Sequence, residues 1–178
     1  MVENKKRVEE FISKTIYFET GGKKDGAYTN DKRDSGGETK WGISKTAHPD
    51  LNIKTLTYKD AKAIYEKEYF NKLYDSIRNE KLAFKVFDMG VLMGPYTAVR
   101  LLQKAIVKYR ATIKVDGRFG PMTLAAINMT EDDVLYEAYL AELRARVYWI
   151  TLIKPWNKAF LKGWANRINY NYGEADGK

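Results

Sequence analysis

The sequence contains no cysteine and only one histidine, His48. The lack of cysteine excludes a disulfide scaffold, a cysteine-ligated metal site and a thiol nucleophile. A single histidine argues against a histidine-rich zinc site and against most histidine-dependent catalytic triads. Because His48 precedes Pro49 in a polar stretch, we expect its side chain to be exposed and to take no part in chemistry.

Long apolar runs are also lacking, and none is long enough to cross a membrane. The first twenty residues carry a charge every few positions and lack the apolar stretch of a signal peptide. We therefore expect synthesis in the cytoplasm without a signal peptide and no stable insertion in a membrane. A protein of this kind that acts outside the cytoplasm needs another route to its target.

Basic residues outnumber acidic ones. The chain has 31 basic and 23 acidic residues, which gives a net charge of +8. The excess is spread evenly along the chain, so a solvated, mildly basic surface accounts for any single lysine. The positive net charge favours a polyanionic partner. Composition alone does not choose between nucleic acid, an anionic membrane and an anionic cell-wall polymer. A basic helix face, a zinc motif and an aromatic-glycine RNA signature are all missing, so we expect no nucleic-acid partner.

Helical periodicity dominates the rest of the 178 residues. Apolar residues recur at helical spacing over residues 3–18, and a capping box at Thr57–Asp60 predicts a helix through about residue 72. Further helices are expected over 82–93, from Pro95, from Pro121, over 130–152 and over 156–168. In the last of these, Phe160, Trp164 and Ile168 are expected to face inward. Asp116-Gly117 predicts a turn, and Asp88, between Phe87 and Met89, is expected to be a buried, hydrogen-bonded acid that holds helices together.

These patterns predict a mainly α protein with one long irregular region near the N-terminus. Residues 20–40 contain five glycines and many charges, and are expected to form a loop with a short β-hairpin. Residues 1–85 and 86–178 form the two expected segments. Since no Pro/Ser-rich linker separates them, we expect them to pack into one compact body, and we expect a monomer.

The loop of residues 20–40 contains several carboxylates, and the residue just before it, Glu19, is also acidic. Long loops in compact proteins are often functional. Glu19 ends a helix whose last turn is Ile16-Tyr17-Phe18, and an apolar, aromatic setting favours a protonated carboxyl near neutral pH. A glycosidase needs such a group as general acid, with a second, ionised carboxylate to stabilise the transition state or to activate water. Asp31 and Asp34 fit the second role, although on spacing alone an ordinary solvated acid at a helix end is the better explanation of Glu19.

A resemblance makes the catalytic interpretation the stronger one. Glu19-Thr20-Gly21-Gly22, Tyr28-Thr29-Asn30-Asp31 and the run Asp34 to Ser44 resemble the N-terminal signature of glycoside hydrolase family 108. This family comprises lysozyme-like N-acetylmuramidases of phages and bacteria. Further along, the runs Leu101–Ala105, Val115–Ile127 and Gly163–Arg167 resemble the predicted peptidoglycan-binding segment that usually follows. An insertion that includes Lys23-Lys24-Asp25 departs from the family pattern beside the proposed acid.

The resemblance implies a lysozyme-like helical fold and a role for each matching residue. It makes Glu19 the catalytic acid, Asp34 the carboxylate that assists at the anomeric carbon, and Thr39 the residue that helps to hold water. Asp31 competes with Asp34 for the second carboxylate. Substrate-binding candidates are Asp31 and the aromatic residues that could stack on sugar rings, although buried core aromatics are commoner: Tyr28, Trp41, Tyr65 and Tyr69.

The implied activity is hydrolysis of the β-1,4 bond between N-acetylmuramic acid and N-acetylglucosamine in bacterial peptidoglycan, without a metal or an organic cofactor. Retention or inversion depends on the distance between the two carboxyls. The alternative is a non-catalytic peptidoglycan-binding or secretion-associated regulatory protein. A bacteriolytic enzyme of the endolysin type, made without a signal peptide, is expected to reach the wall after holin release or by export outside the Sec pathway.

Overall fold

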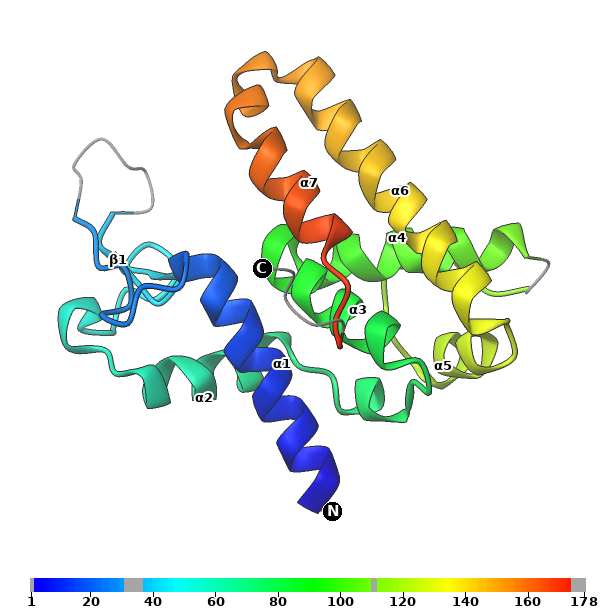
Figure 1. Ribbon diagram of the computed structural model, residues 1–178, viewed down its shortest axis with the longest axis horizontal. Helices are drawn as coiled ribbons and strands as arrows, with labels where there is room; N and C mark the ends of the chain where they lie inside the picture. Colours follow the sequence, from blue (N-terminus) through cyan, green and yellow to red (C-terminus); the bar gives the residue numbers. More distant parts are fainter. Residues whose placement is uncertain (1, 31–36, 110–111, 174–178) are drawn as a thin grey trace. The chain divides into compact units, whose positions relative to one another are not determined.

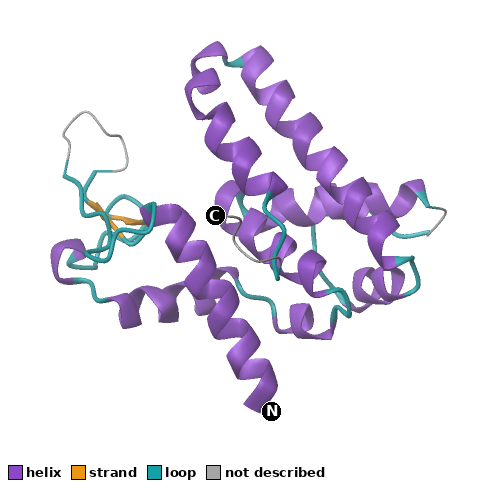
Figure 2. Ribbon diagram, viewed as in Figure 1, coloured by secondary structure: helices purple, strands orange, loops and turns teal. Residues whose placement is uncertain are grey.

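The computed structural model describes residues 2–30, 37–109 and 112–173. Helices make up most of these residues, and the described strands form one small antiparallel hairpin (Figures 1 and 2). The expected mainly α, lysozyme-like fold is confirmed. The chain divides into two compact units, Met1–Phe70 and Asn71–Lys178, which are described separately below.

The first unit is built from two helices and the hairpin. Helix α1 spans Val2–Thr20 and packs against α2, Tyr58–Tyr69. The predicted capping box is present at the start of α2: Thr57 accepts from the backbone N–H of Asp60, and the Asp60 side chain accepts from the N–H of Thr57. Helix α2 ends at Tyr69, earlier than expected. Buried side chains of the two helices form the core of this unit: Phe11, Ile12, Ile16, Ala61 and Tyr65.

The β-hairpin of the first unit follows the loop that the glycines predict. Strand β1, Thr39–Lys40, pairs with β2, Ile43–Ser44, with Lys40 opposite Ile43. Thr29 adds an antiparallel bridge to Thr39. A short 3-10 helix, η1 (Ile53–Thr55), connects the hairpin to α2.

The second unit contains the remaining helices. They are η2 (Lys72–Ser76), α3 (Glu80–Met93), α4 (Pro95–Lys108), α5 (Pro121–Asn128), α6 (Asp132–Ile153), η3 (Pro155–Phe160) and α7 (Leu161–Asn169). Helix α3 packs against α4, α4 against α6, and α6 against α7. The side chains of Leu82 to Met89 in α3 are fully buried, which makes this helix the centre of the unit.

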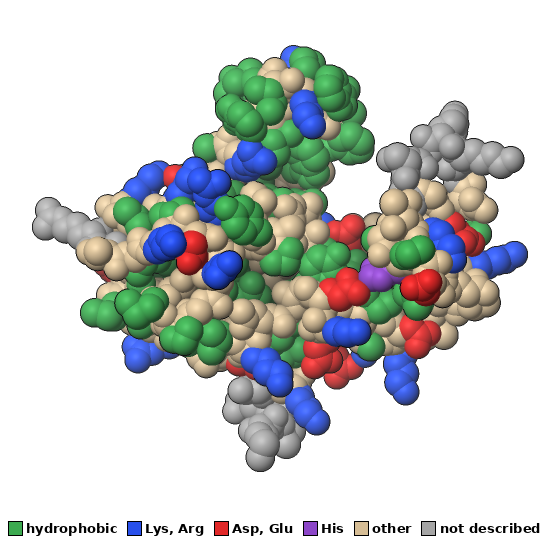
Figure 3. All heavy atoms as spheres, turned by 180° about the vertical axis from the view of Figure 1, so that it is seen from behind, with side chains coloured by type: hydrophobic (Ala, Val, Ile, Leu, Met, Phe, Trp, Pro, Cys, Tyr) green, Lys and Arg blue, Asp and Glu red, His purple; other side chains and the backbone are tan. Residues whose placement is uncertain are grey.

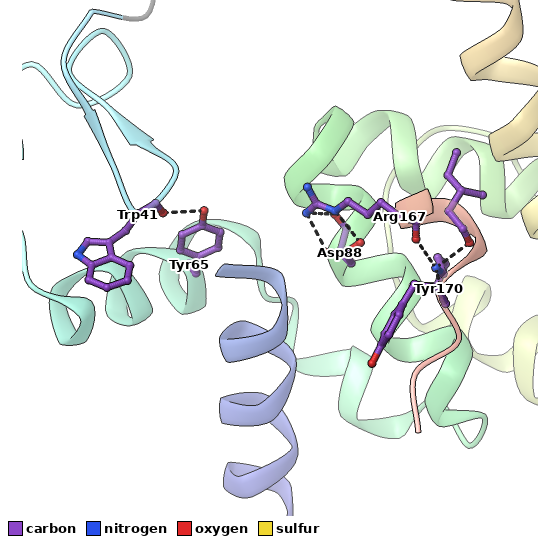
Figure 4. A network of polar contacts seen from close by, with 7 residues as sticks. Trp41, Tyr65, Asp88, Arg167 and Tyr170 are labelled. Carbon is purple, nitrogen blue, oxygen red and sulfur yellow. Dashed lines mark hydrogen bonds and ion pairs between the residues drawn. The ribbon is translucent and has the colours of Figure 1, made fainter. Parts of the chain in front are cut away.

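A buried ion pair joins α3 to α7, as Figure 4 shows. The guanidinium of Arg167 donates to both carboxylate oxygens of Asp88, at 2.8 and 2.9 Å. The expectation that Asp88 is a buried, hydrogen-bonded acid between helices is confirmed. Nearby, the buried ammonium of Lys85 donates to the backbone carbonyls of Arg167, Ile168 and Tyr170, which lie at the C-terminal end of α7. Burial lowers the pKa of Lys85 to about 8.

Gln103 of α4 organises the turn at Asp116-Gly117. Its buried amide nitrogen donates to the Asp116 carboxylate and to the carbonyl of Arg118, and its amide oxygen accepts from the N–H of Gly117 at 2.7 Å. Gly117 has a φ of +72°, a conformation that favours glycine. The predicted turn is therefore confirmed.

Helices α6 and α7, with η3 between them, form a helical hairpin whose tip carries exposed apolar side chains (Figures 1 and 3). The expected helix over 156–168 is wrong in its first part, because Pro155 opens a 3-10 helix and α7 begins only at Leu161. The inward orientation expected for Phe160 is also wrong. Its ring is 57% exposed and stacks on Trp164 with centroids 5.8 Å apart.

Among the described residues, no helix has both the length and the apolar character needed to span a membrane. The segments expected at 1–85 and 86–178, and their packing into one body, stay predictions.

Candidate active site

Glu19 lies in the last turn of α1, where its side chain contacts the tip of the β-hairpin. Gly42 occupies the hairpin turn, and a Cβ atom built on it would lie 3.0 Å from Cβ and 3.1 Å from Cγ of Glu19. The same atom would also collide with the hydroxyl of Tyr65. Only the absence of a side chain at Gly42 therefore allows the hairpin to approach the stem of Glu19. Glu19 is partly exposed there.

The turn that carries Gly42 has an unusual backbone. Trp41 and Gly42 connect paired residues Lys40 and Ile43, and both have positive φ, +56° and +77°. Positive φ at both central residues is the condition for a type I′ turn, whose first position normally takes Asn, Asp or Gly. A tryptophan in this conformation is strained, and such strain persists only where the surroundings impose it.

Contacts around the indole of Trp41 impose this conformation. Its ring nitrogen donates to the carbonyl of Leu56 at 3.2 Å, and its ring lies 5.2 Å from that of Tyr58. On the other side, a Cβ on Gly26 would come within 2.5 Å of the indole. Trp41 is only 9% exposed, and this burial supports a role in fixing the turn rather than in stacking on a sugar.

Tyr65 and Tyr69 of α2 complete the surroundings of Glu19. The buried hydroxyl of Tyr65 donates to the carbonyl oxygen of Trp41 at 3.1 Å (Figure 4). Tyr69 is partly exposed, and its ring centroid lies 5.7 Å from that of Tyr65. Burial, followed by the negative charges of Glu68 and Glu19, raises the pKa of Tyr69. The phenol of Tyr69 therefore lies within electrostatic reach of Glu19 and stays a hydrogen-bond donor at neutral pH.

The other described candidates lie on the hairpin and on the strand segment beside it. Thr39 exchanges two backbone hydrogen bonds with Thr29, both of 2.9 Å, and its hydroxyl donates to the carbonyl of Gly37. The hydroxyl of Tyr28 donates to the carboxylate of Glu38 at 2.6 Å, and this bond is the main cause that raises the pKa of Tyr28. Glu38 is thus a hydrogen-bonded carboxylate next to Thr39. In the sequence Glu38 is one of several acids of the loop, and no pattern predicted a role for it.

Asp31 and Asp34, the candidates for the second carboxylate, lie outside the described residues. Their roles as catalytic and substrate-binding residues stay predictions.

The expectation that His48 is exposed is wrong. Its side chain is 15% exposed, and its Nε2 lies 3.5 Å from the carboxylate of Glu68, the neighbour of Tyr69 on α2. Sequence spacing gave no signal for this pair, because η1 and most of α2 separate its members along the chain. The pair anchors the segment after β2 to the end of α2 that carries Tyr69.

The described part of the site contains carboxylates, phenols and a threonine hydroxyl. No group of three or more His, Cys, Asp or Glu that could hold a metal ion occurs within residues 2–30, 37–109 and 112–173. A carboxyl beside phenolic donors is suited to proton transfer to an oxygen of a substrate.

Comparison with known proteins assigns both parts of the chain. Residues 18–94 match the family described as glycosyl hydrolase 108, and residues 97–169 match the family described as predicted peptidoglycan domain. The chain is also similar to the solved structure of Brucella abortus SagA, with 25% sequence identity, a TM-score of 0.67 and coverage of 90% of each chain. No curated protein matches the chain. The matched glycosyl hydrolase segment includes Glu19, the hairpin and α2.

Proposed function

We propose that the chain is an N-acetylmuramidase with Glu19 as its general acid. The match of residues 18–94 to glycosyl hydrolase 108, followed by a predicted peptidoglycan domain, makes it a glycoside hydrolase of the lysozyme type. The coarser conclusion, a peptidoglycan hydrolase, follows from the two matched families. The bond cleaved and the role of Glu19 are the proposal. The family of residues 18–94 also favours an enzyme over a non-catalytic wall-binding or secretion-associated regulatory protein.

The observation that supports Glu19 most is its contact with the strained turn. The Trp41-Gly42 turn approaches so closely that Gly42 lies against the Cβ and Cγ of Glu19. A general acid must hold its proton at a fixed position relative to the leaving oxygen. Packing of its stem against this turn restricts the rotamers of Glu19 while the residue stays partly exposed.

In the proposed reaction, the Glu19 carboxyl donates its proton to the glycosidic oxygen between N-acetylmuramic acid and N-acetylglucosamine. An ionised carboxylate, Asp34 or Asp31, stabilises the positive charge that develops at the anomeric carbon or activates water. Thr39 helps to hold that water. Tyr69, a phenolic donor within electrostatic reach of Glu19, can bind a sugar hydroxyl or acetamido oxygen beside the scissile bond. Water adds to the anomeric carbon in place of the leaving oxygen, and the proton that it releases restores the acid form of Glu19 directly or through solvent.

The products test the bond specificity. Purified peptidoglycan is digested with the enzyme, and the new reducing ends are reduced with borohydride and identified after acid hydrolysis. The proposal predicts muramicitol. New N-acetylglucosamine ends would show a glucosaminidase, and soluble fragments without reducing ends would show a non-hydrolytic cleavage.

Action on the cell wall follows from the same two families. The route to the wall, by holin release or by export outside the Sec pathway, stays a proposal, as do the endolysin role and the monomeric state.

A further inference from the structure

A groove runs between α4 and α6 in the second unit. Two adjoining cavities of about 440 and 220 Å³ share the lining residues Leu101, Lys104 and Arg146. The lining residues recur at helical spacing, so one stripe of each helix faces the groove: Tyr96, Thr97, Arg100, Leu101 and Lys104 on α4, and Glu142, Ala145, Arg146 and Trp149 on α6. Cavities of several hundred Å³ are the size that binds a small molecule or a short segment of polymer.

Positive charge dominates this groove. Arg100, Lys104 and Arg146 line it, and the structure shows no ion pair of these three with any described residue. Of the described lining residues Glu142 alone is acidic, and Lys108 neutralises it in a close ion pair. The buried Nε of Arg146 has no hydrogen-bond partner within the described part of the chain. A buried donor of this kind is costly unless a ligand or water satisfies it.

Aromatic rings stand at two points of the groove wall. Tyr96 is 57% exposed, and its ring rests on Gly117, where a Cβ would come within 2.5 Å of it. The turn that Gln103 holds therefore fixes the ring of Tyr96 while leaving part of it open to a ligand. Trp149 is 50% exposed, and the guanidinium of Arg146 lies 5.0 Å from its ring centroid. Aromatic faces next to cations that form no ion pair suit a ligand that has both sugar or methyl surface and negative charge.

We propose that this groove is the wall-binding site of the chain and that it recognises the carboxylate-bearing peptide stem of peptidoglycan at its junction with the glycan. The inference rests on the proposed function, because it takes peptidoglycan as the polymer. Arg100 and Arg146 would hold stem carboxylates with paired N–H donors, Lys104 would add an ammonium, and Tyr96 and Trp149 would contact apolar faces of the sugar and of alanine methyls. Phosphate-bearing wall polymers share the negative charge, and the test below separates them from the peptide stem.

Matched charge variants test the groove by co-sedimentation with purified sacculi freed of attached phosphate polymers. The groove variant is R100Q/K104Q/R146Q. The control is K154Q/K158Q/K162Q, which removes the same charge from exposed lysines of η3, α7 and the residue before them. We expect the groove variant to bind at least tenfold more weakly and the control to change less than threefold. Equal losses would show attraction by net charge alone, and no loss in the groove variant would also overturn the proposal.

Since Arg146 is partly buried, R100E/K104E serves as a second groove variant that changes only exposed residues. Thermal unfolding confirms the fold of each variant. A further measurement identifies the ligand group: wild type should bind glycan strands stripped of their peptides as weakly as the groove variant binds intact sacculi. Unchanged binding to stripped glycan, or binding only to sacculi that retain phosphate polymers, would contradict recognition of the stem.

Hydrolysis of a short, soluble glycan of alternating N-acetylmuramic acid and N-acetylglucosamine that carries no peptide stem separates this inference from the proposed function. The groove variant should cleave it as fast as wild type, because the groove lies outside the residues around Glu19. If wild type fails to cleave any glycan while the groove variants lose binding, the muramidase proposal fails and the groove stands. If cleavage is normal and binding is unchanged in the groove variants, the groove inference fails alone.

Discussion

The hydroxyl of Tyr65 donates a hydrogen bond of 3.1 Å to the carbonyl oxygen of Trp41, and this bond ties helix α2 to the strained turn beside Glu19. Both partners are buried, so the carbonyl has no access to water once the bond is lost. The bond connects two segments that are distant in sequence, the hairpin and α2, and Gly42 of the same turn lies against Glu19 at the end of α1. It explains how a turn that disfavours tryptophan stays in place against the proposed acid.

Substitution of Tyr65 by Phe removes this hydrogen bond and keeps the aromatic ring. We expect the free energy of unfolding to fall by about 1–3 kcal/mol, because a buried carbonyl is left without its donor. We also expect kcat on peptidoglycan to fall several-fold, because Gly42 and the Glu19 stem lose their fixed spacing. Tyr17→Phe is the matched control, since Tyr17 is 55% exposed on the same helix as Glu19. Chemical denaturation and turbidity assays measure the two effects, and equal behaviour of both variants would contradict the role of Tyr65.

Gly42→Ala places a methyl group where Glu19 and the Tyr65 hydroxyl already lie. We expect loss of at least tenfold in activity and about 1 kcal/mol or more in stability, because the residue also has positive φ. Gly163→Ala provides the opposite expectation: its site in α7 is open, and alanine there should stabilise the chain by roughly 0.5–1 kcal/mol without changing activity. An active Gly42→Ala enzyme would show that the close approach of the turn is dispensable.

Much of the fold was predictable from local signals. The capping box at Thr57, the prolines that open α4 and α5, and the Asp116-Gly117 turn all lie where the sequence placed them, because each depends on a few neighbouring residues. The buried character of Asp88 followed from its apolar neighbours. Its partner Arg167 lies 79 positions away, and no local pattern connects them.

The candidate site was predictable in its residues but not in its geometry. The resemblance identified Glu19, whereas the packing of Gly42 against it and the turn made by Trp41 depend on long-range contacts with Leu56 and Tyr65. Trp41 shows the limit of composition: an aromatic residue in a loop predicts sugar stacking as readily as burial. The pair of His48 and Glu68 was also missed, because no local pattern connects the two residues.

The ion pair between Asp88 and Arg167 predicts a large coupling in stability. Arg167→Gln leaves a fully buried carboxylate without its bidentate partner, and we expect a loss of about 3–5 kcal/mol in the free energy of unfolding. Adding Asp88→Asn should restore part of that loss, because the uncompensated charge is removed. A double-mutant cycle from urea unfolding measures the coupling, and strictly additive losses would contradict it.

Lys85 predicts a specific pH dependence of stability. Its pKa is about 8 in the folded chain against an ordinary value of 10.5, so between these values the unfolded chain binds more protons. The contribution of Lys85 to the free energy of unfolding therefore rises with pH, by about 1–2 kcal/mol between pH 7.5 and 9.5. The measured pH range ends at 9.5, below the ordinary pKa of tyrosine. At higher pH the unfolded chain loses tyrosine protons, whereas burial raises the pKa of Tyr74 to about 12, so the free energy of unfolding falls with pH there.

Comparison with Lys85→Met isolates this effect. The variant loses three hydrogen bonds to the end of α7 and should be less stable at every pH. Its unfolding free energy should also lack the rise that the lysine contributes. Parallel curves for the two proteins from pH 7.5 to 9.5 would contradict the assignment to Lys85.

The most direct test of the central claim compares Glu19→Gln with Glu68→Gln in single-turnover digestion of purified peptidoglycan. Both changes replace a carboxyl by an amide on neighbouring elements of the site, but Glu19 alone is the proposed proton donor. We predict that Glu19→Gln lowers the rate at least a thousandfold while the protein keeps its unfolding transition and its binding to sacculi, and that Glu68→Gln lowers it less than tenfold. A Glu19→Gln enzyme that retains a tenth or more of the wild-type rate would contradict the assignment of Glu19 as general acid.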